Sequence, residues 1–168
     1  GDQLFLDMYD EPQFVHELLQ FCTELYISCT LTLKAALREP EESCFHGHAL
    51  IQGIHMNNGG VRISEDTATL ISPEQIDEFV IPYDKQVLDR FGGGFIHYCG
   101  KHDHLLDAYL SLEGVRAINF GNPEMHDFTL TMEKFRTSGV CCFGKWPVEA
   151  GETPREYFQR IGRMTAGG

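Results

Sequence analysis

The sequence predicts an α/β fold in which about four parallel strands alternate with helices. Short apolar runs end at glycine, as in Val115–Phe120 before Gly121 and Val140–Phe143 before Gly144. Stretches with apolar residues at helical spacing separate these runs. Parallel strands need a crossover of helical length between them, and both faces of such a sheet are covered. We therefore expect repeated strand–helix units with a buried sheet.

Length and charge limit the classes of function. The chain has 168 residues, enough for one domain over 1–168 with a sizeable core. Its formal net charge is −12, and no run of Lys and Arg offers a surface to nucleic acid. No apolar run reaches the length of a membrane span, and no signal peptide opens the chain. We expect neither nucleic acid nor membrane as a partner.

The cysteines indicate a reducing compartment. Two lie in a predicted helix and three on predicted strands, which does not resemble a small secreted disulfide framework. We therefore expect reduced thiols, a cytoplasmic location and metal binding as the most specific use of one or two of them. The six are Cys22, Cys29, Cys44, Cys99, Cys141 and Cys142.

The first predicted helix begins after Asp10 and Glu11, with Pro12 in its first turn, and runs to about Leu37. Residues 41–60 are expected to form a long loop, with a short hairpin or a helical turn as alternatives. This loop carries His46, His48 and His55. These histidines suit a metal site, but we favour polar groups at the surface or facing a ligand.

The remaining elements follow in order, each bounded by turn formers or helix caps. A helix capped by Ser72 should be kinked at Pro82, because proline lacks the N–H that a helix interior needs. The predicted strands are 61–64, 95–99, 115–120 and 140–143, and the predicted helices are 72–88, 102–112, 123–137 and 153–164.

Four strands cannot close an eight-stranded barrel, so we expect a segment of a larger barrel. In parallel α/β folds the chemistry lies where strands end and loops begin. Several residues that can carry chemistry fall at such ends: Glu65, Asp66, His97, Cys99, Asn119 and Cys142.

The most specific pair is His97 and Cys99. Residues two apart on a strand project to the same side, so an imidazole and a thiol should lie together. Zinc accepts both of these ligands. The alternative is a buried cysteine beside a hydrogen-bonded histidine.

Three segments together resemble the uroporphyrinogen decarboxylase superfamily. They are the opening run Tyr9–Leu19 (YDEPQFVHELL), the run Ile71–Tyr83 (ISPEQIDEFVIPY) and Phe95–Gly100 (FIHYCG). The C-terminal run Tyr157–Ile161 (YFQRI) also resembles the segment before that family's last barrel strand. The resemblance implies a TIM (β/α)8 barrel, of which this chain matches the C-terminal half.

The superfamily implies two chemistries. Its methyltransferase branch moves a methyl group from a corrinoid to a thiol, using zinc held by a His-x-Cys pair and a later Cys. His97 and Cys99 match that pair, and Cys142, or Cys141 on the opposite face, would supply the third ligand. The other branch removes carboxyl groups from a porphyrinogen without a cofactor. A third alternative is a non-catalytic fragment or corrinoid-binding module.

Further roles follow from the resemblance and the strand-end positions. Glu65 and Asp66 are candidate general acids or bases, or a fourth ligand. Asn119, Trp146 and His55 are candidates for binding substrate, a thiol, corrinoid or tetrapyrrole. A corrinoid protein or a second copy of the chain is the expected macromolecular partner.

Overall fold

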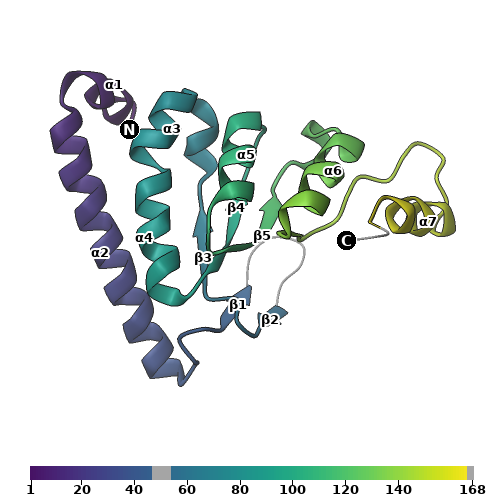
Figure 1. Cartoon of the computed structure of the whole chain (residues 1–168), viewed down its shortest axis with the longest axis horizontal. Helices are drawn as coiled ribbons and strands as arrows, with labels where there is room; N and C mark the ends of the chain where they lie inside the picture. The colour runs from purple at the N-terminus through teal and green to yellow at the C-terminus, as the bar shows by residue number, and fades with distance from the viewer. Residues whose placement is uncertain (47–53, 166–168) are drawn as a thin grey trace.

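The computed structural model describes residues 1–46 and 54–165 (Figure 1). The described part contains seven α-helices, two 3-10 helices and six strands. In chain order they are α1 (Gln3–Asp10), α2 (Pro12–Leu37), β1 (Cys44–His46), β2 (Ile54–Met56), β3 (Val61–Ser64), η1 (Asp66–Leu70), α3 (Pro73–Phe79), α4 (Ile81–Phe91), β4 (Gly94–Tyr98), α5 (Asp103–Ser111), β5 (Val115–Phe120), η2 (Pro123–Met125), α6 (Phe128–Ser138), β6 (Cys141–Cys142) and α7 (Pro154–Thr165).

The central sheet is parallel and has the strand order β3-β4-β5-β6, which follows the order of the chain. The prediction of four parallel strand–helix units is confirmed. The register aligns Ser64 with His97 and His97 with Asn119, so the ends of three strands meet at one edge. The four strands form an open sheet, and the eight-stranded barrel stays a prediction.

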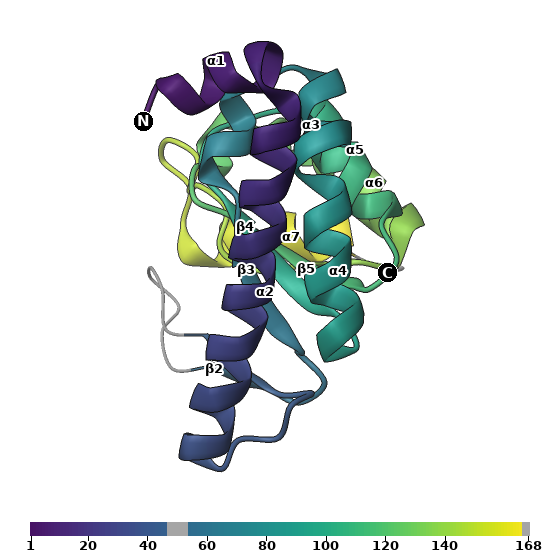
Figure 2. The ribbon, with the colours of Figure 1, turned by 90° about the vertical axis from the view of Figure 1, so that its left-hand side faces the viewer.

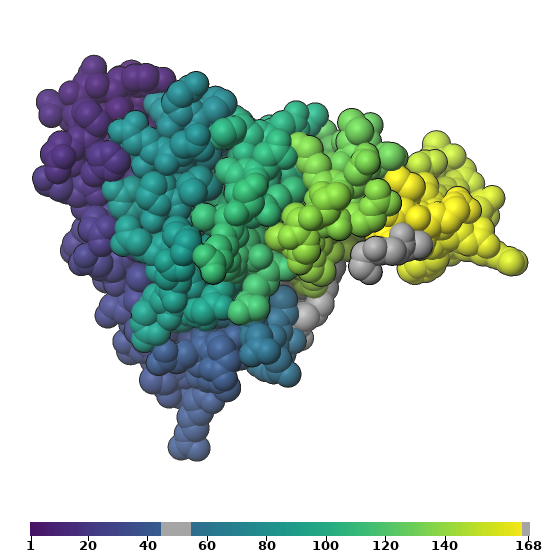
Figure 3. All heavy atoms as spheres, viewed as in Figure 1, coloured from purple at the N-terminus to yellow at the C-terminus, as the bar shows by residue number. Residues whose placement is uncertain are grey.

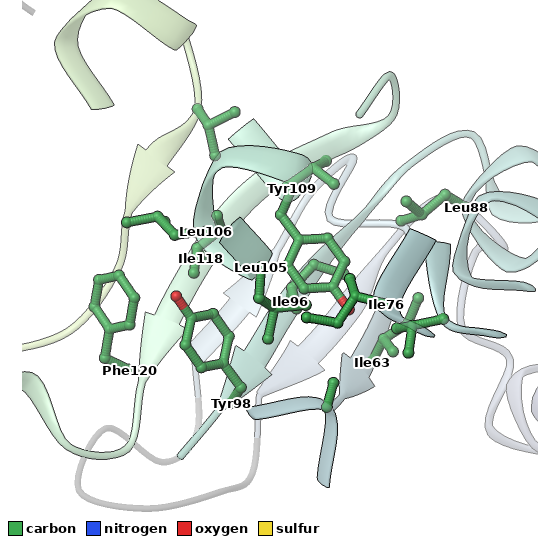
Figure 4. Packing of buried hydrophobic residues seen from close by; sticks show 14 of the residues in the cluster. Ile63, Ile76, Leu88, Ile96, Tyr98, Leu105, Leu106, Tyr109, Ile118 and Phe120 are labelled. Carbon is green, nitrogen blue, oxygen red and sulfur yellow. The ribbon is translucent and has the colours of Figure 1, made fainter. Parts of the chain in front are cut away.

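Helices cover one face of the sheet. Figures 1 and 2 show α2, α4, α5 and α6 side by side along this face. The long α2 lies at the edge of the sheet that β3 forms. Alternate strand residues, among them Ile96 and Ile118, pack there against the helices, for example against Leu105 (Figure 4). These apolar side chains are fully buried, so this layer provides most of the hydrophobic stabilisation.

On the opposite face of the sheet, the antiparallel hairpin β1-β2 packs against part of β4 and β5. Cys44 and Met56 of the hairpin pack against Phe95 and Ala117 of the sheet. The long loop expected over 41–60 therefore contains a short hairpin, one of the two alternatives. His48 lies outside the described residues.

Buried Lys34 joins the end of α2 to the start of the hairpin. Its ammonium group donates to the carbonyl oxygens of Ser43 and Gly60, the latter at 3.1 Å. Glu39 lies 3.7 Å from the same nitrogen. A buried charge is tolerated here because oxygen atoms surround it.

Two predicted helices are divided. The helix expected over 72–88 separates at Val80 into α3 and α4, because Pro82 cannot donate to the carbonyl of Glu78. The predicted kink is thus a complete break. The helix expected over 123–137 becomes η2 and α6, because the side chain of Asp127 accepts from Leu130 N and starts a new helix.

The N-terminal helix α1 was not expected from the sequence. Strand β6 is limited to two residues, fewer than the four predicted over 140–143. The segment after β6 leads to α7, which lies to one side of the sheet and helices (Figure 3). No helix in the described part of the chain has the length and apolarity needed to cross a membrane.

Candidate metal centre

His97 and Cys99 lie at the carboxyl end of β4, as predicted. His97 is the fourth residue of the strand and only 1% exposed, and Cys99 follows the last strand residue. The sulfur of Cys99 lies 3.7 Å from Nε2 of His97. The alternation of a strand therefore places thiol and imidazole together, even though Cys99 lies just beyond the regular ladder.

Asp66 completes a group of three. It begins η1 directly after β3, and its Oδ1 lies 3.8 Å from Nε2 of His97. The three potential ligand atoms of Asp66, His97 and Cys99 all lie within 4.8 Å of one another. Asp66 was predicted as a general acid or base or a fourth ligand, and the geometry places it among the residues that could hold a metal ion.

The spacing fits a tetrahedral metal ion. Zinc bonds of about 2.0–2.3 Å to nitrogen, oxygen and sulfur separate neighbouring tetrahedral ligands by about 3.3–3.8 Å. The two distances from His97 Nε2, 3.7 and 3.8 Å, lie at the upper end of this separation, and the three atoms together lie within 4.8 Å of one another. A soft thiolate, an imidazole and a carboxylate form a donor set that zinc accepts. Three protein ligands leave a fourth position for another molecule.

Local contacts orient the two outer ligands. Oδ1 of Asp66 accepts a hydrogen bond of 2.6 Å from the backbone N–H of Cys99. Burial raises the pKa of the Cys99 thiol, and the Asp66 carboxylate raises it further. The thiol is therefore protonated near neutral pH in the metal-free protein, and metal binding would have to release this proton.

Asn119 lies behind His97 on β5. Its Oδ1 is 2.6 Å from Nδ1 of His97, and its Nδ2 donates to the carbonyl oxygen of Phe143 at 2.6 Å. Asn119 is 7% exposed. Predicted as a substrate-binding residue, it contacts a candidate metal ligand through these hydrogen bonds.

Three residues that contact Cys99 or the following Gly100 were not identified as site residues from the sequence. Asn122 accepts from the N–H of Gly100 at 3.0 Å, and Nε2 of His126 lies 3.2 Å from the Gly100 carbonyl oxygen. The backbone of Gly121 passes so close to Cys99 that a side chain there would overlap its sulfur. Their position after β5 could have identified them as neighbours of Cys99, because the carboxyl ends of parallel strands meet at one edge of the sheet.

Glu65 is placed apart from the three-ligand group. It lines a pocket of about 440 Å³ between β3, α2 and α4, together with Asp84. Tyr109 donates a hydrogen bond of 2.5 Å to Asp84. Burial raises the pKa of both carboxyl groups, and the charge of Asp84 raises that of Glu65 further. Adjacent residues 65 and 66 thus have different surroundings.

The structure does not bring Cys142, Trp146 or His55 to the metal centre. Cys142 belongs to the core on the helix-covered face, and burial raises the pKa of its thiol to about 12. Trp146 is buried in the same core, with its ring 4.6 Å from that of Phe128. His55 is exposed on β2 of the hairpin.

Comparisons with models of protein families, with curated proteins and with solved structures gave no match for this chain.

Proposed function

We propose that Asp66, His97 and Cys99 bind a zinc ion that activates a thiol substrate. The observation that carries this proposal is that a carboxylate oxygen, an imidazole nitrogen and a sulfur all lie within 4.8 Å of one another, with the sulfur and the oxygen 3.7 and 3.8 Å from His97 Nε2. Three protein ligands and one open position are characteristic of catalytic rather than structural zinc.

The surroundings of the three ligands fit this role. The His97 side chain is buried, whereas that of Asp66 is 54% exposed, so the centre is held in the protein on one side and accessible on the other. Zinc at this position would lower the pKa of a thiol that binds it. The chain itself would supply a fixed imidazole, a thiolate and a carboxylate, and the Asp66–Cys99 hydrogen bond would hold the latter two in place.

The reaction we propose is methyl transfer from a corrinoid to a thiol. The resemblance of the His97–Cys99 pair to the methyltransferase branch of the uroporphyrinogen decarboxylase superfamily supports it. We further propose that the four strands belong to a TIM barrel. The reaction is tested with methylcobalamin as donor and 2-mercaptoethanesulfonate as acceptor, with and without zinc.

Metal binding is the decisive experiment because it requires no knowledge of the substrate. Metal-free protein is titrated with zinc against a chromogenic chelator, and with cobalt to detect the absorption of a sulfur ligand. We expect one ion per chain. Cys99→Ser should lower zinc affinity at least about tenfold and remove the sulfur–cobalt band. Cys29→Ser, which replaces an exposed cysteine of α2, is the matched control.

Failure to bind stoichiometric zinc would overturn the proposal. In that case the cofactor-free carboxy-lyase and the non-catalytic fragment become the better interpretations. If zinc binds but Cys99→Ser has no effect, the site lies elsewhere in the chain.

A further inference from the structure

We propose that Asn119 is a positioning residue that fixes His97 in the tautomer protonated on Nδ1, so that Nε2 presents its lone pair to the metal centre. The functional role that we assign to Asn119 rests on the proposed metal site. The hydrogen bonds that carry it, however, are present without any metal.

The carbonyl oxygen of Phe143 can only accept a hydrogen bond. Its partner at 2.6 Å must therefore be the amide nitrogen of Asn119, which fixes the orientation of this side chain. The amide oxygen then faces Nδ1 of His97 at 2.6 Å. Because an amide oxygen only accepts, Nδ1 must carry the hydrogen.

The sheet positions all three residues of this chain of hydrogen bonds. His97 and Asn119 are register partners on β4 and β5. Phe143 directly follows β6, and its N–H donates to the carbonyl oxygen of Ile118 at 2.8 Å, which fixes the main chain beside Asn119. The rigid backbone of three adjacent strands therefore sets the tautomer.

Burial makes this arrangement hard to replace. His97 is 1% exposed and Asn119 is 7% exposed, so water cannot readily substitute for either partner. On the other side of the ring, Nε2 faces Cys99 Sγ at 3.7 Å and Asp66 Oδ1 at 3.8 Å. A metal-binding histidine commonly donates its other N–H to an oxygen atom, which sets its orientation and strengthens it as a ligand.

The first measurement is nitrogen NMR of the metal-free full chain containing ¹⁵N-histidine, at a pH where His97 is neutral. His97→Gln identifies the resonances. We expect the proton on Nδ1 in the wild type. Asn119→Leu, which keeps a similar shape but cannot accept, should allow the other tautomer. Asn119→Asp, which keeps an acceptor, should preserve the Nδ1 proton. Ala117→Ser, on the same face of β5, is the control.

A zinc titration of the same proteins is the second measurement. Asn119→Leu should bind zinc between about tenfold and 100-fold more weakly than the wild type, whereas the control should be unchanged. A proton on Nε2 of wild-type His97 would overturn the inference, whether or not any variant folds. Unchanged zinc affinity in a folded Asn119→Leu would also overturn it.

The two proposals fail separately. If His97 carries its proton on Nδ1 and the wild type binds no zinc, the metal site is wrong and the fixed tautomer stands. If zinc binds through Cys99 and His97 is protonated on Nε2 in the metal-free protein, the metal site stands and the role of Asn119 is wrong.

Discussion

Gly121→Ala should weaken metal binding without changing any proposed ligand. A Cβ at this position would overlap Sγ of Cys99 and lie 3.3 Å from both its Cα and its Cβ. Because non-bonded carbon and sulfur atoms need roughly 3.5–4.0 Å, the sulfur must move by more than about 1 Å. Metal bonds tolerate errors of only about 0.2 Å, so a sulfur displaced this far cannot complete the centre.

The cost to stability should be small. The backbone of Gly121 lies outside the left-handed region, so alanine causes no backbone strain there. The sulfur is the end of a side chain that can rotate, and the contacts at 3.3 Å require only a slight adjustment. We expect the free energy of unfolding to fall by about 1 kcal/mol, and zinc affinity to fall at least about tenfold.

The assay pairs a urea unfolding curve with a zinc titration. Gly162→Ala is the matched control, because its Cβ would meet no atom within 4 Å and it lies in α7. This control should bind zinc as the wild type does. If Gly121→Ala unfolds like the wild type and also binds zinc with unchanged affinity, then Cys99 does not ligate the metal through the position seen here.

Three further predictions test the surroundings of the site. Burial raises the pKa of Asp84 in the folded protein, so folding favours its neutral form and wild-type stability should fall as the pH rises through about 7. Asp84→Asn should reduce this slope, with Glu65 contributing the remainder, and should raise the free energy of unfolding at pH 8 by about 2 kcal/mol, measured by melting curves; an unchanged slope would contradict it. Cys142→Ala should leave zinc affinity unchanged and lower the unfolding free energy by about 1 kcal/mol, since its thiol lies in the core; weaker zinc binding would return Cys142 to the site. Lys34→Met should lower the unfolding free energy by about 2–4 kcal/mol in urea, because buried carbonyl oxygens lose their donor, and a neutral effect would show that water replaces the ammonium group.

Much of the fold could be predicted because local signals and tertiary packing agree. Glycine-bounded apolar runs became β3 to β6, and the proline near the start of α2 marked its first turn correctly. The divided helices show where local signals were insufficient. Pro82 predicts a disturbance, but whether the helix bends or breaks depends on how α3 and α4 pack against the sheet.

The site was predictable where one strand determines the geometry. His97 lies on β4 and Cys99 directly follows that strand, so the alternation of side chains was enough to place them together. The third candidate ligand comes from another segment. To identify it, one must know which face of the sheet each strand-end residue occupies. Cys142 aligns with Ile118 and faces the helices, a register that the sequence of β6 alone does not reveal.

Glu65 and Asp66 show why a shift of one residue decides the chemistry at a strand end. The N–H of Glu65 still donates to the His97 carbonyl oxygen at 2.8 Å, so Glu65 continues the ladder and its side chain enters the pocket beside α4. Asp66 begins η1, where the chain leaves the sheet and turns toward Cys99. The ladder thus ends between the two acids. A carboxylate reaches the metal centre because the turn begins at residue 66, and a turn one residue earlier or later would present a different side chain to His97.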